Sequence, residues 1–561
     1  MCGIFALLCP NDTLSYDVVN EYFMKGKKRG PEFSILKKIK KENYTLYIGF
    51  HRLAINGLDE ISNQPIVENN KHLICNGEIY NYKTLYEKQN IIPKTNSDCE
   101  VIMSLYERNG PQCVSMLDGV FSFILYDETT NQVMIARDPY GVRPLYECYY
   151  EDGIIGFSSD LECLTFNTIH HIQAYQPGSY TIFQKTPTQY SWNMVHREKY
   201  FFNISYLPLI SFHNTIEYYM YTFVSLLKNA VYKRVQNCER NIACLLSGGL
   251  DSSIISSLVR KMYFEKTGYV LETYSIGLSG AEDFKYAKQV ASHINSTHHE
   301  IIMTHDEMIE SIPHVIKDIE SYDTTTVRAS VGNWNIGKYI SQHSDSKVIF
   351  NGDGSDELAG GYLYFNACPN DEMFDEETRR LLKDIHRFDV LRSDKSISSH
   401  GLEPRTPFLD KELTRFYLSI PIEYRNHNQE QNCEKYFIRK SIEIYEPNLL
   451  PHDILWRQKE AFSDGISNVD KSWYEIIQEH DHIKNVENTT TTHWEYNSPV
   501  TKEQKYYRTI FDSYFPKQCE TLIPYFWMPR FIEQAHDASA RTLKLYTRTE
   551  NKITNGMDNE G

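Results

Sequence analysis

The fold of the second half of the chain is decided by one stretch, Asn241-Ile242-Ala243-Cys244-Leu245-Leu246-Ser247-Gly248-Gly249-Leu250-Asp251-Ser252-Ser253. Its apolar first half predicts a buried strand, and residues 254–262 predict a helix. A glycine-rich loop between a strand and a helix binds anions, because glycines let backbone N–H groups approach a phosphate and the helix N-terminus adds positive potential. A tight turn also favours Gly and Ser, but the string 247–253 is much more specific than such a turn requires. The loop lacks the lysine of a Walker loop.

Strand and helix patterns alternate after this loop. Residues 273–278, 297–302 and 347–350 are predicted strands, and residues 284–294 are a predicted helix. Alternation of this kind predicts a doubly wound α/β sheet, in which ligands bind at the carboxyl ends of the strands. The run 351–357, Asn-Gly-Asp-Gly-Ser-Asp-Glu, falls at such an end. We therefore expect its carboxylates and glycines to face a ligand.

Two other groups of polar residues in this half have two interpretations each. His298-His299-Glu300 suggests a metal site, but neighbouring residues of a strand point to opposite faces, which favours structural roles. Arg457 and Lys459 form a basic cluster in an acidic chain and need an anionic partner. That partner is either a surface carboxylate or an anionic substrate.

The first two residues, Met1-Cys2, carry a second candidate site. Initiator Met is normally removed when the next residue is small, which leaves Cys2 with both a thiol and a free α-amine. An α-amine titrates near pH ~7.7–8, so it can take the thiol proton as the chain's own general base. The alternative is that Cys2 is an ordinary small apolar residue near the start of a strand.

Several polar residues interrupt the strand-rich pattern of the N-terminal region. Arg52 follows an apolar run and pairs either with a structural carboxylate or with a substrate carboxylate, for which a guanidinium offers a bidentate fork. Asn76-Gly77 lies between two apolar runs, which is a hairpin signal, or else points an amide and a backbone N–H at a developing oxyanion. Asp98 either complements a helix dipole or binds a substrate ammonium. Many strands and few helices predict stacked antiparallel sheets with flanking helices.

Length and composition limit the class of protein. The 561 residues suggest roughly two to four domains, and 41% apolar residues fit a globular protein. A net charge of -16 disfavours non-specific nucleic-acid binding, which needs a basic surface. No apolar run approaches the ~20 residues that span a bilayer, and the N-terminus lacks a secretion signal. The 12 scattered cysteines form no metal motif, so we expect a reducing, cytoplasmic location.

Six strings of the N-terminal region together resemble the N-terminal-nucleophile glutamine amidotransferase domain. They are Cys2-Gly3-Ile4, Arg29-Gly30-Pro31, Arg52-Leu53, Asn76-Gly77-Glu78-Ile79-Tyr80-Asn81, Ser97-Asp98-Cys99-Glu100 and Arg137-Asp138 with Gly141. The resemblance implies a four-layer αββα fold and glutamine hydrolysis with Cys2 as the nucleophile. It also implies an oxyanion hole from Asn76 and Gly77, with Arg52 and Asp98 on the α-carboxylate and α-ammonium of glutamine. The implied glutamine-binding residues are Arg52, Leu53, Asn76, Gly77, Glu78 and Asp98.

The chain departs from this family's pattern at two places. Lys28 stands where the family usually has His, before the Arg-Gly-Pro turn. Ser159-Asp160-Leu161-Glu162 stands where the family usually has Ser-Glu-x-Lys, which reverses a charge. We expect the second change to alter a contact at the domain junction and to leave the nucleophile unaffected.

The loop at 247–253 matches the pyrophosphate loop of ATP pyrophosphatases, which cleave ATP to AMP and pyrophosphate. Together with the N-terminal strings and the runs 387–392, 403–410 and 456–465, it makes residues 1–525 resemble asparagine synthetase B, the glutamine-hydrolysing type. The implied ATP-binding residues are Leu245, Ser247, Gly248, Gly249, Asp251, Ser252, Ile276, Asn351 and Gly352.

The same resemblance implies roles for charged residues of the second site. Asp251 and Asp356 would hold Mg²⁺, and Lys459 would reach the phosphate and the acyl-adenylate. Asp353 stands where many members have Glu, a carboxylate tied to intermediate formation and to proton removal from ammonia. The reacting pair would lie near two further residues, Asp389 and Arg392.

We therefore predict a two-site ligase. Residues 1–195 form an α+β N-terminal-nucleophile amidotransferase domain, residues 210–525 form an α/β doubly wound ATP-pyrophosphatase-type synthetase domain, and 526–561 form a polar, partly disordered tail. Cys2 releases ammonia from glutamine. The second site makes β-aspartyl-AMP and pyrophosphate from aspartate and ATP, and ammonia displaces AMP to give asparagine. We expect Mg²⁺, no nucleic-acid or membrane partner, and a homodimer through the N-terminal domains.

Two alternatives differ in substrate or in class. The same adenylation chemistry can amidate a different carboxylate, as in relatives that resemble β-lactam synthetase. An intact Cys2 argues against a synthetase that needs no ammonia. A catalytically silent binding or regulatory protein is the other alternative, which the full set Cys2, Asp251, Asp356 and Lys459 disfavours.

Overall fold

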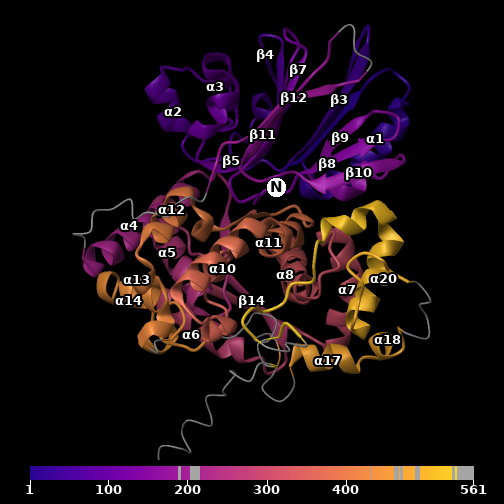
Figure 1. Cartoon of the computed structure of the whole chain (residues 1–561). Helices are drawn as coiled ribbons and strands as arrows, with labels where there is room; N and C mark the ends of the chain where they lie inside the picture. The colour runs from indigo at the N-terminus through magenta and orange to yellow at the C-terminus, as the bar shows by residue number, and fades with distance from the viewer. Residues whose placement is uncertain are drawn as a thin grey trace, which may run out of the picture.

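Two six-stranded antiparallel sheets form the N-terminal part of the protein (Figure 1). The computed structural model describes residues 1–186, 191–202, 215–430, 433–459, 467, 472–486, 493–532, 537–539 and 542. The first sheet has the order β10-β8-β9-β1-β3-β2 and comprises β1 (Gly3–Cys9), β2 (Phe33–Lys41), β3 (Tyr44–Arg52), β8 (Tyr146–Tyr150), β9 (Ile155–Ser158) and β10 (Ile169–Ala174). The second has the order β12-β11-β7-β6-β5-β4 and comprises β4 (Ile66–Glu68), β5 (Lys71–Ile79), β6 (Gly119–Asp127), β7 (Gln132–Arg137), β11 (Ser179–Gln184) and β12 (Asn193–Lys199).

The two sheets share one core and are covered by helices on their outer faces. Alternate residues of β1, such as Ile4, pack with Ile74 of β5 and Ile124 of β6 between the sheets. The other face of β1 packs on α1 (Tyr16–Met24), and the outer face of the second sheet packs on α2 (Tyr82–Gln89) and α3 (Glu100–Asn109). Because strand side chains alternate with a period of two, each strand contributes one face to the core between the sheets and the other face to the packing against the helices. The predicted αββα fold is confirmed.

The hairpin interpretation of Asn76-Gly77 is wrong. Both residues lie inside β5, paired with Ser122 and Phe121 of β6. The hairpin turn between β4 and β5 lies instead at Asn69 and Asn70, whose φ angles are +48° and +59°. Asparagine tolerates these left-handed angles, and two of them in sequence make the tight turn that antiparallel strands need.

The C-terminal part is built on a five-stranded parallel sheet with the order β15-β14-β13-β16-β17. Its strands are β13 (Ile242–Leu245), β14 (Glu272–Leu278), β15 (Thr297–Met303), β16 (Val348–Phe350) and β17 (Glu403–Arg405). Helices cover both faces. On one face, α4 (Ile216–Gln236) and α5 (Leu250–Thr267) pack with Cys244 and Phe350; on the other, α8 (Thr324–His343) and α11 (Asp389–Ser398) pack with Ala243 and Ile349. The predicted doubly wound α/β fold is confirmed.

The described helices of this part are α4 (Ile216–Gln236), α5 (Leu250–Thr267), α6 (Glu282–Ile294), α7 (His305–Ile319), α8 (Thr324–His343), α9 (Ser355–Ala359), α10 (Asp371–Asp384), α11 (Asp389–Ser398), α12 (Lys411–Ser419), α13 (Ile422–Arg425), α14 (Tyr436–Tyr445), α15 (His452–Leu455), α17 (Trp473–Glu479), α18 (Asp481–Lys484) and α20 (Lys502–Tyr514). None of the described helices is long and apolar enough to cross a membrane.

The strand order reverses between β13 and β16. The chain moves from β13 to β14 and β15 on one side, and β16 and β17 continue on the other. Open α/β sheets bind ligands outside the carboxyl ends of the strands at such a switch point. The loops that leave β13 and β16 are 246–249 and 351–354, so two predicted site segments meet there.

The two parts of the chain join through a mixed apolar and charged junction. Leu53 and Tyr140 of the N-terminal part belong to the same core cluster as Phe408 of the C-terminal part. Strand β12 ends at Lys199 and α4 begins at Ile216, so the first fold extends beyond residue 195, and the predicted start at 210 lies outside the described residues.

The predicted tail begins with a packed segment. Trp527 is buried, its indole ring lies 5.4 Å from the Tyr362 ring, and its backbone N–H donates to Asp323 Oδ1 at 2.7 Å. Asp537 lies 2.7 Å from Arg328 Nη1. The last residues, 543–561, lie outside the described part of the chain.

Candidate active sites

Cys2 lies directly before β1, at the junction of the two parts. Its thiol donates to the Leu53 carbonyl oxygen at 3.6 Å, and its own carbonyl accepts Arg29 Nε at 3.0 Å. Burial raises the pKa of this thiol to about 11 in the chain that retains Met1. The Met1 α-amine is buried as well, donates to the Leu402 carbonyl at 3.2 Å, and has its pKa lowered by burial to about 5. The Met1 amine therefore lies inside the protein, and Cys2 is half-buried beside it.

Asn76 and Gly77 are close to the same point. Ser159 Oγ accepts the Ile4 backbone N–H at 3.1 Å and the Asn76 amide at 3.4 Å, which brings β5 against the start of β1. A Cβ on Gly77 would lie 2.6 Å from Phe121 Cα, so only glycine fits beside β6 here. The amide oxygen of Asn76 is buried and has no hydrogen-bond partner among the described residues.

Arg52 organises a loop beside the thiol. Its Nη1 donates to the Asp59 carbonyl at 2.9 Å and to Asn63 Oδ1 at 2.7 Å, and its Nη2 donates to the Gly57 carbonyl. No carboxylate of the described residues pairs with it, so the first of its two proposed partners, a structural carboxylate, is not found there. The guanidinium holds the loop 56–63 as one wall of the site.

Asp98 and Glu78 occupy different surroundings. Asp98 Oδ2 accepts the Ile79 backbone N–H at 2.6 Å, and burial raises the pKa of this carboxyl to about 6. Glu78 Oε2 accepts the Asn56 amide at 2.5 Å and lies 3.3 Å from Arg405 Nη2 on β17. Burial, together with Asp98 and Glu403, holds the pKa of Glu78 well above its usual value. The Glu78 side chain therefore faces the domain junction.

The loop after β13 has the geometry of an anion cradle. The Ser247 hydroxyl accepts the Gly249 backbone N–H at 3.3 Å and contacts Ser252 Oγ at 3.1 Å, at the start of α5. Gly248 has φ +76°, and a Cβ there would lie 2.5 Å from Tyr286 C. Because Gly248 has no side chain, α6 can pack directly against the loop. The backbone N–H groups in the first turn of α5 have no partner within the helix, as at any helix start, and such groups suit an anion.

The loop after β16 packs on the first turn of α5. A Cβ on Gly352 would lie 2.7 Å from Asp251 Cβ. Asp251 Oδ1 accepts the Ser355 hydroxyl at 2.7 Å, and the Asn351 amide donates to Ser393 Oγ of α11 at 2.7 Å. Close backbone approach thus places Asp251 and the 351–354 loop at one point of the sheet edge.

Two carboxylates and two ammonium groups form the charged centre of the site. Lys435 Nζ lies 2.6 Å from Asp251 Oδ2 and 2.6 Å from Asp356 Oδ1. Lys459 Nζ lies 2.7 Å from Asp356 Oδ2 and 4.0 Å from Asp251 Oδ2. Against the effect of burial, these two lysines hold the pKa of Asp356 well below its usual range. The partner of Lys459 is an active-site carboxylate.

Asp353 lies beside a second acidic group. Arg392 Nη2 lies 3.4 Å from Asp353 Oδ1 and 3.0 Å from Asp389 Oδ1. The other Asp353 oxygen is buried without a hydrogen-bond partner. Glu357 accepts the Tyr362 hydroxyl, and burial with Asp389 and Asp356 nearby holds the pKa of Glu357 well above its ordinary value.

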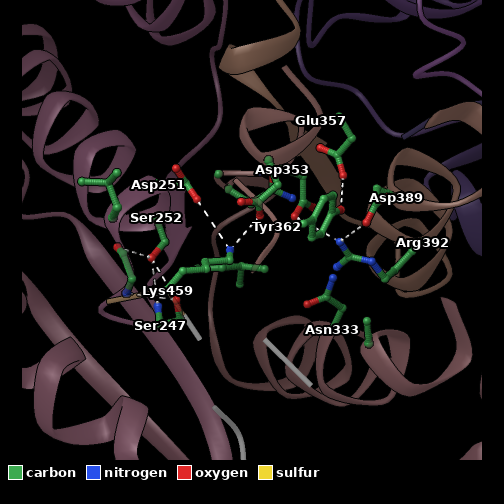
Figure 2. A pocket seen from close by; sticks show the side chains of 18 of the residues that line it. Ser247, Asp251, Ser252, Asn333, Asp353, Glu357, Tyr362, Asp389, Arg392 and Lys459 are labelled. Carbon is green, nitrogen blue, oxygen red and sulfur yellow. Dashed lines mark hydrogen bonds and ion pairs between the residues drawn. The ribbon is translucent and has the colours of Figure 1, made fainter. Parts of the chain in front are cut away.

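A cavity of about 230 Å³ connects these groups (Figure 2). Figure 2 shows Ser247, Asp251 and Ser252 on one side and Asp389 and Arg392 on the other, with Lys459 extending between them. The predicted residues that line it are Leu245, Ser247, Gly249, Asp251, Ser252, Ile276, Asn351, Gly352, Asp353, Asp356 and Lys459. Gly248 is not among the lining residues, and its lack of a side chain lets α6 pack against the loop.

Many lining residues were not predicted from the sequence, and three of them matter most for the site. They are Lys435, Tyr362 and Trp527, which reach the cavity from segments without a motif of their own. Lys435 follows a Cys-Glu pair before α14, and nothing local distinguishes it from a surface lysine. Trp527 was assigned to the tail, although a large aromatic residue in a polar segment is a signal for packing.

The donor set at Asp251 and Asp356 fits a small hard cation. Mg²⁺ typically uses one or two protein carboxylates and takes its other oxygens from phosphates and water. One nitrogen already lies 2.6 Å from an oxygen of each carboxylate, so a cation can contact both at once. The described residues contain no cluster of three His, Cys, Asp or Glu side chains arranged for a metal. The remaining oxygens would therefore come from the nucleotide.

The His298-His299-Glu300 run has structural contacts. The two ring nitrogens of His298 contact Thr273 Oγ1 at 3.0 Å and Ser275 Oγ at 3.1 Å. The His299 ring stacks on Tyr274 at 4.7 Å. The two imidazoles thus serve different neighbours, as their alternation along β15 predicts.

Comparison with known proteins finds relatives across both parts. Residues 1–219 match the family described as glutamine amidotransferase domain, and residues 222–372 and 366–524 match the family described as asparagine synthase. The glutamine-hydrolyzing asparagine synthetase of Gallus gallus is 42% identical over 574 residues, which cover 97% of this chain and 99% of the relative. Its counterparts from Rattus norvegicus and Homo sapiens are 40% and 39% identical; they cover 98% and 97% of this chain, and 100% and 99% of their own lengths.

Proposed function

The chain belongs to the family of glutamine-hydrolysing asparagine synthetases, and we propose how its residues divide that reaction between two sites. The protein uses ATP, aspartate, glutamine and water to make asparagine, glutamate, AMP and pyrophosphate, through β-aspartyl-AMP and internally released ammonia. The assignment of each step to named residues is our proposal.

Glutamine hydrolysis is assigned to Cys2. After Met1 is removed, the α-amine of Cys2 takes the thiol proton, and the thiolate attacks the side-chain carbonyl carbon of glutamine. Asn76 and Gly77 donate N–H groups to the oxyanion. Ammonia leaves, and water hydrolyses the thioester to glutamate. The support is the meeting of Cys2, Leu53 and Asn76 around the start of β1.

Glutamine is held by charge at both ends of its amino-acid group. Asp98 offers a carboxylate to the α-ammonium, and Arg52 offers its guanidinium to the α-carboxylate. Arg52 also holds the loop 56–63, so substrate binding and loop closure depend on the same group. The Leu53 carbonyl oxygen lies beside the Cys2 thiol. Glu78 follows Gly77 in β5, and its carboxylate faces Arg405.

Adenylation of aspartate is assigned to the cavity at the switch point. The β-carboxylate of aspartate attacks the α-phosphorus of ATP and pyrophosphate leaves, because a bare carboxylate is a poor electrophile and needs a leaving group. The loop 247–252 receives the phosphates, Ile276 and Leu245 border the adenine, and Lys459 neutralises charge that develops on phosphate oxygens. Mg²⁺ held by Asp251 and Asp356 would supply further charge neutralisation. Asp353 takes a proton from ammonia as it displaces AMP.

The observation that carries this assignment is the charged centre at the strand ends. Two carboxylates, Asp251 and Asp356, and the lysine Lys459 converge beside a glycine-rich loop at the reversal of strand order. Polyphosphate transfer needs this combination of cation sites and N–H donors. The same chain carries the thiol site that supplies ammonia.

A product assay with two nitrogen sources tests the assignment. Purified wild-type protein should form asparagine, AMP and pyrophosphate from aspartate and ATP with either glutamine or ammonium. Cys2→Ala should keep the ammonium-dependent reaction and lose the glutamine-dependent reaction. A variant with uncleaved residues before Cys2 should behave like Cys2→Ala, since Met1 is already fully buried and the Cys2 nitrogen would remain an amide. Loss of both reactions in Cys2→Ala would refute the division of labour.

Three finer features belong to the same proposal. We propose Mg²⁺ as the metal, a homodimer through the amidotransferase domains, and a cytoplasmic location. The acidic net charge of -16 fits the lack of a nucleic-acid partner, and all 12 cysteines are free, as a reducing compartment allows. Sedimentation of the full chain tests the dimer. Removal of Mg²⁺ with a chelator, followed by the product assay, tests the metal requirement.

A further inference from the structure

Lys435 places its ammonium between the two carboxylates of the synthetase site. Its Nζ lies 2.6 Å from Asp251 Oδ2 and 2.6 Å from Asp356 Oδ1, and 1% of its side chain is exposed. We propose that this ammonium fills the metal position in the nucleotide-free protein, so that the divalent cation enters only together with ATP. The inference rests on the proposed metal ligation by Asp251 and Asp356.

The position of Lys435 is built into the fold. Its φ of +58° and ψ of +30° are left-handed, which costs free energy for a residue with a side chain. It directly precedes α14, whose first turn begins with the bond from Arg439 N–H to the Lys435 carbonyl at 3.1 Å. The helix start and the backbone geometry together fix the direction of its side chain.

Gly361 leaves the space that this side chain needs. A Cβ on Gly361 would overlap Lys435 Cε and lie 2.8 Å from Lys435 Nζ. The Gly361 backbone N–H donates to the Asp356 carbonyl at 2.9 Å, which fixes the glycine beside the carboxylate. The long lysine stem is therefore enclosed on its way to the charged centre.

Charge balance explains why a free dication is kept out. The carboxylates of Asp251 and Asp356 face the two ammonium groups of Lys435 and Lys459, so the four groups are neutral as a set. A bare divalent ion would give this set a charge of about +2 in a buried site, where repulsion between like charges is poorly screened. Polyphosphate brings about four negative charges, which accommodate the metal and both lysines together.

The geometry favours exchange of one cation for another at the same point. Mg²⁺ binds oxygens at roughly 2.0–2.1 Å, and a point shared by two carboxylates is a site that it can use with phosphate oxygens. When the Lys435 ammonium shifts toward the bound phosphates, the two carboxylates become free to bind the metal. It is thus a positioning residue that sets the order of binding.

Manganese binding without nucleotide tests the proposal. Mn²⁺ is titrated into the full-length protein, and free Mn²⁺ is counted by its electron paramagnetic resonance signal. Lys435→Met should bind one Mn²⁺ at least about tenfold more tightly than wild type, because a like charge has been removed from the site. Addition of Asp356→Asn to Lys435→Met should abolish the gain. Lys440→Met is the matched control, since Lys440 lies in α14 with a partly exposed side chain paired to Glu443, and it should bind as wild type does.

The outcomes separate this inference from the proposed function. Tight Mn²⁺ binding to wild type without nucleotide, removed by Asp356→Asn, overturns the inference even if Lys435→Met does not fold. Equal weak binding by wild type and a folded Lys435→Met overturns it as well. Neither measurement requires turnover. If Lys435→Met gains the site but wild type makes no asparagine, the proposed function is refuted and the inference stands.

Discussion

Arg29 and Asp394 form a buried ion pair across the domain junction, with Arg29 Nη2 at 2.7 Å from Asp394 Oδ1. The same guanidinium donates through Nε to the Cys2 carbonyl at 3.0 Å. Asp394 belongs to α11, which also presents Arg392 and Ser393 to the synthetase cavity and the 351–354 loop. Helix α11 is therefore linked through Arg29 to the Cys2 backbone, and it lines the cavity of the second part directly.

Asp394→Asn should weaken the junction and uncouple the two reactions. The change leaves the buried Arg29 and Arg143 without their shared countercharge, which costs about 3 kcal/mol of stability. Ammonia should then escape, so glutamate formed per asparagine formed should rise above one. Urea denaturation and product ratios measure the two effects. Glu376→Gln, an exposed position of α10, is the control, and an unchanged ratio in Asp394→Asn would contradict the coupling.

Glutamine use should decline in acid because of Asp98. Burial raises the pKa of this carboxyl to about 6, so its ionised fraction falls from about 0.9 at pH 7 to about 0.1 at pH 5. Titration of this carboxyl alone should lower the kcat/KM for glutamate release about tenfold over this range, since only the carboxylate attracts the α-ammonium. The effect of Asp98 on stability has the opposite sign. Because its pKa is higher in the folded protein than in the unfolded chain, this group stabilises the fold at pH values below the pKa of the unfolded chain, and the stabilisation is lost as pH rises through about 6.

Asp98→Asn provides the control for this pH dependence. It should lose most glutamine hydrolysis at pH 7, and its kcat/KM should fall about tenfold less than that of wild type between pH 7 and pH 5, because the Cys2 α-amine still titrates. The ammonium-dependent reaction should match that of wild type at each pH. A variant that keeps the wild-type slope would show that another group titrates.

The local motifs could be predicted from the sequence, because their chemistry depends on neighbours in the chain. The loop 247–252 needs only its own glycines and the strand and helix on either side. Of the two interpretations of Asn76-Gly77, the hairpin is wrong, since pairing with β6 overrides the turn propensity of these residues. A rule based on neighbouring residues cannot include the pairing with β6, whose residues lie far along the chain.

The remaining features depend on contacts between distant segments. Lys435 lies 184 residues from Asp251, and Arg29 lies 365 residues from Asp394. Each residue alone resembles an ordinary surface charge, and only the fold makes it a buried partner. The packing of Trp527 beside Tyr362 has the same origin.

Gly248→Ala should damage the nucleotide site through α6. Gly248 and Gly268 have φ angles of +76° and +75°, but a Cβ meets Tyr286 C at 2.5 Å at the first and nothing within 4 Å at the second. Gly268→Ala should therefore cost only the backbone term of about 1 kcal/mol. Gly248→Ala should cost more and weaken ATP binding at least about tenfold, because the loop must move. Calorimetric titration with ATP measures this, and equal affinity in the two variants would contradict the steric argument.

The two departures from the family pattern, Lys28 and Glu162, should compensate each other at the junction. Lys28 Nζ lies 2.6 Å from Asp318 Oδ1, and Glu162 Oε1 lies 3.5 Å from Lys317 Nζ. Burial lowers the pKa of Lys28, but Asp318, Asp160 and Glu162 more than offset this and raise it above its ordinary value.

Glu162→Lys should therefore destabilise the protein by about 1 kcal/mol, and the double variant with Lys28→His should recover roughly half of that loss. Denaturant unfolding of the single and double variants measures the coupling. Losses that simply add would mean that the two positions do not interact.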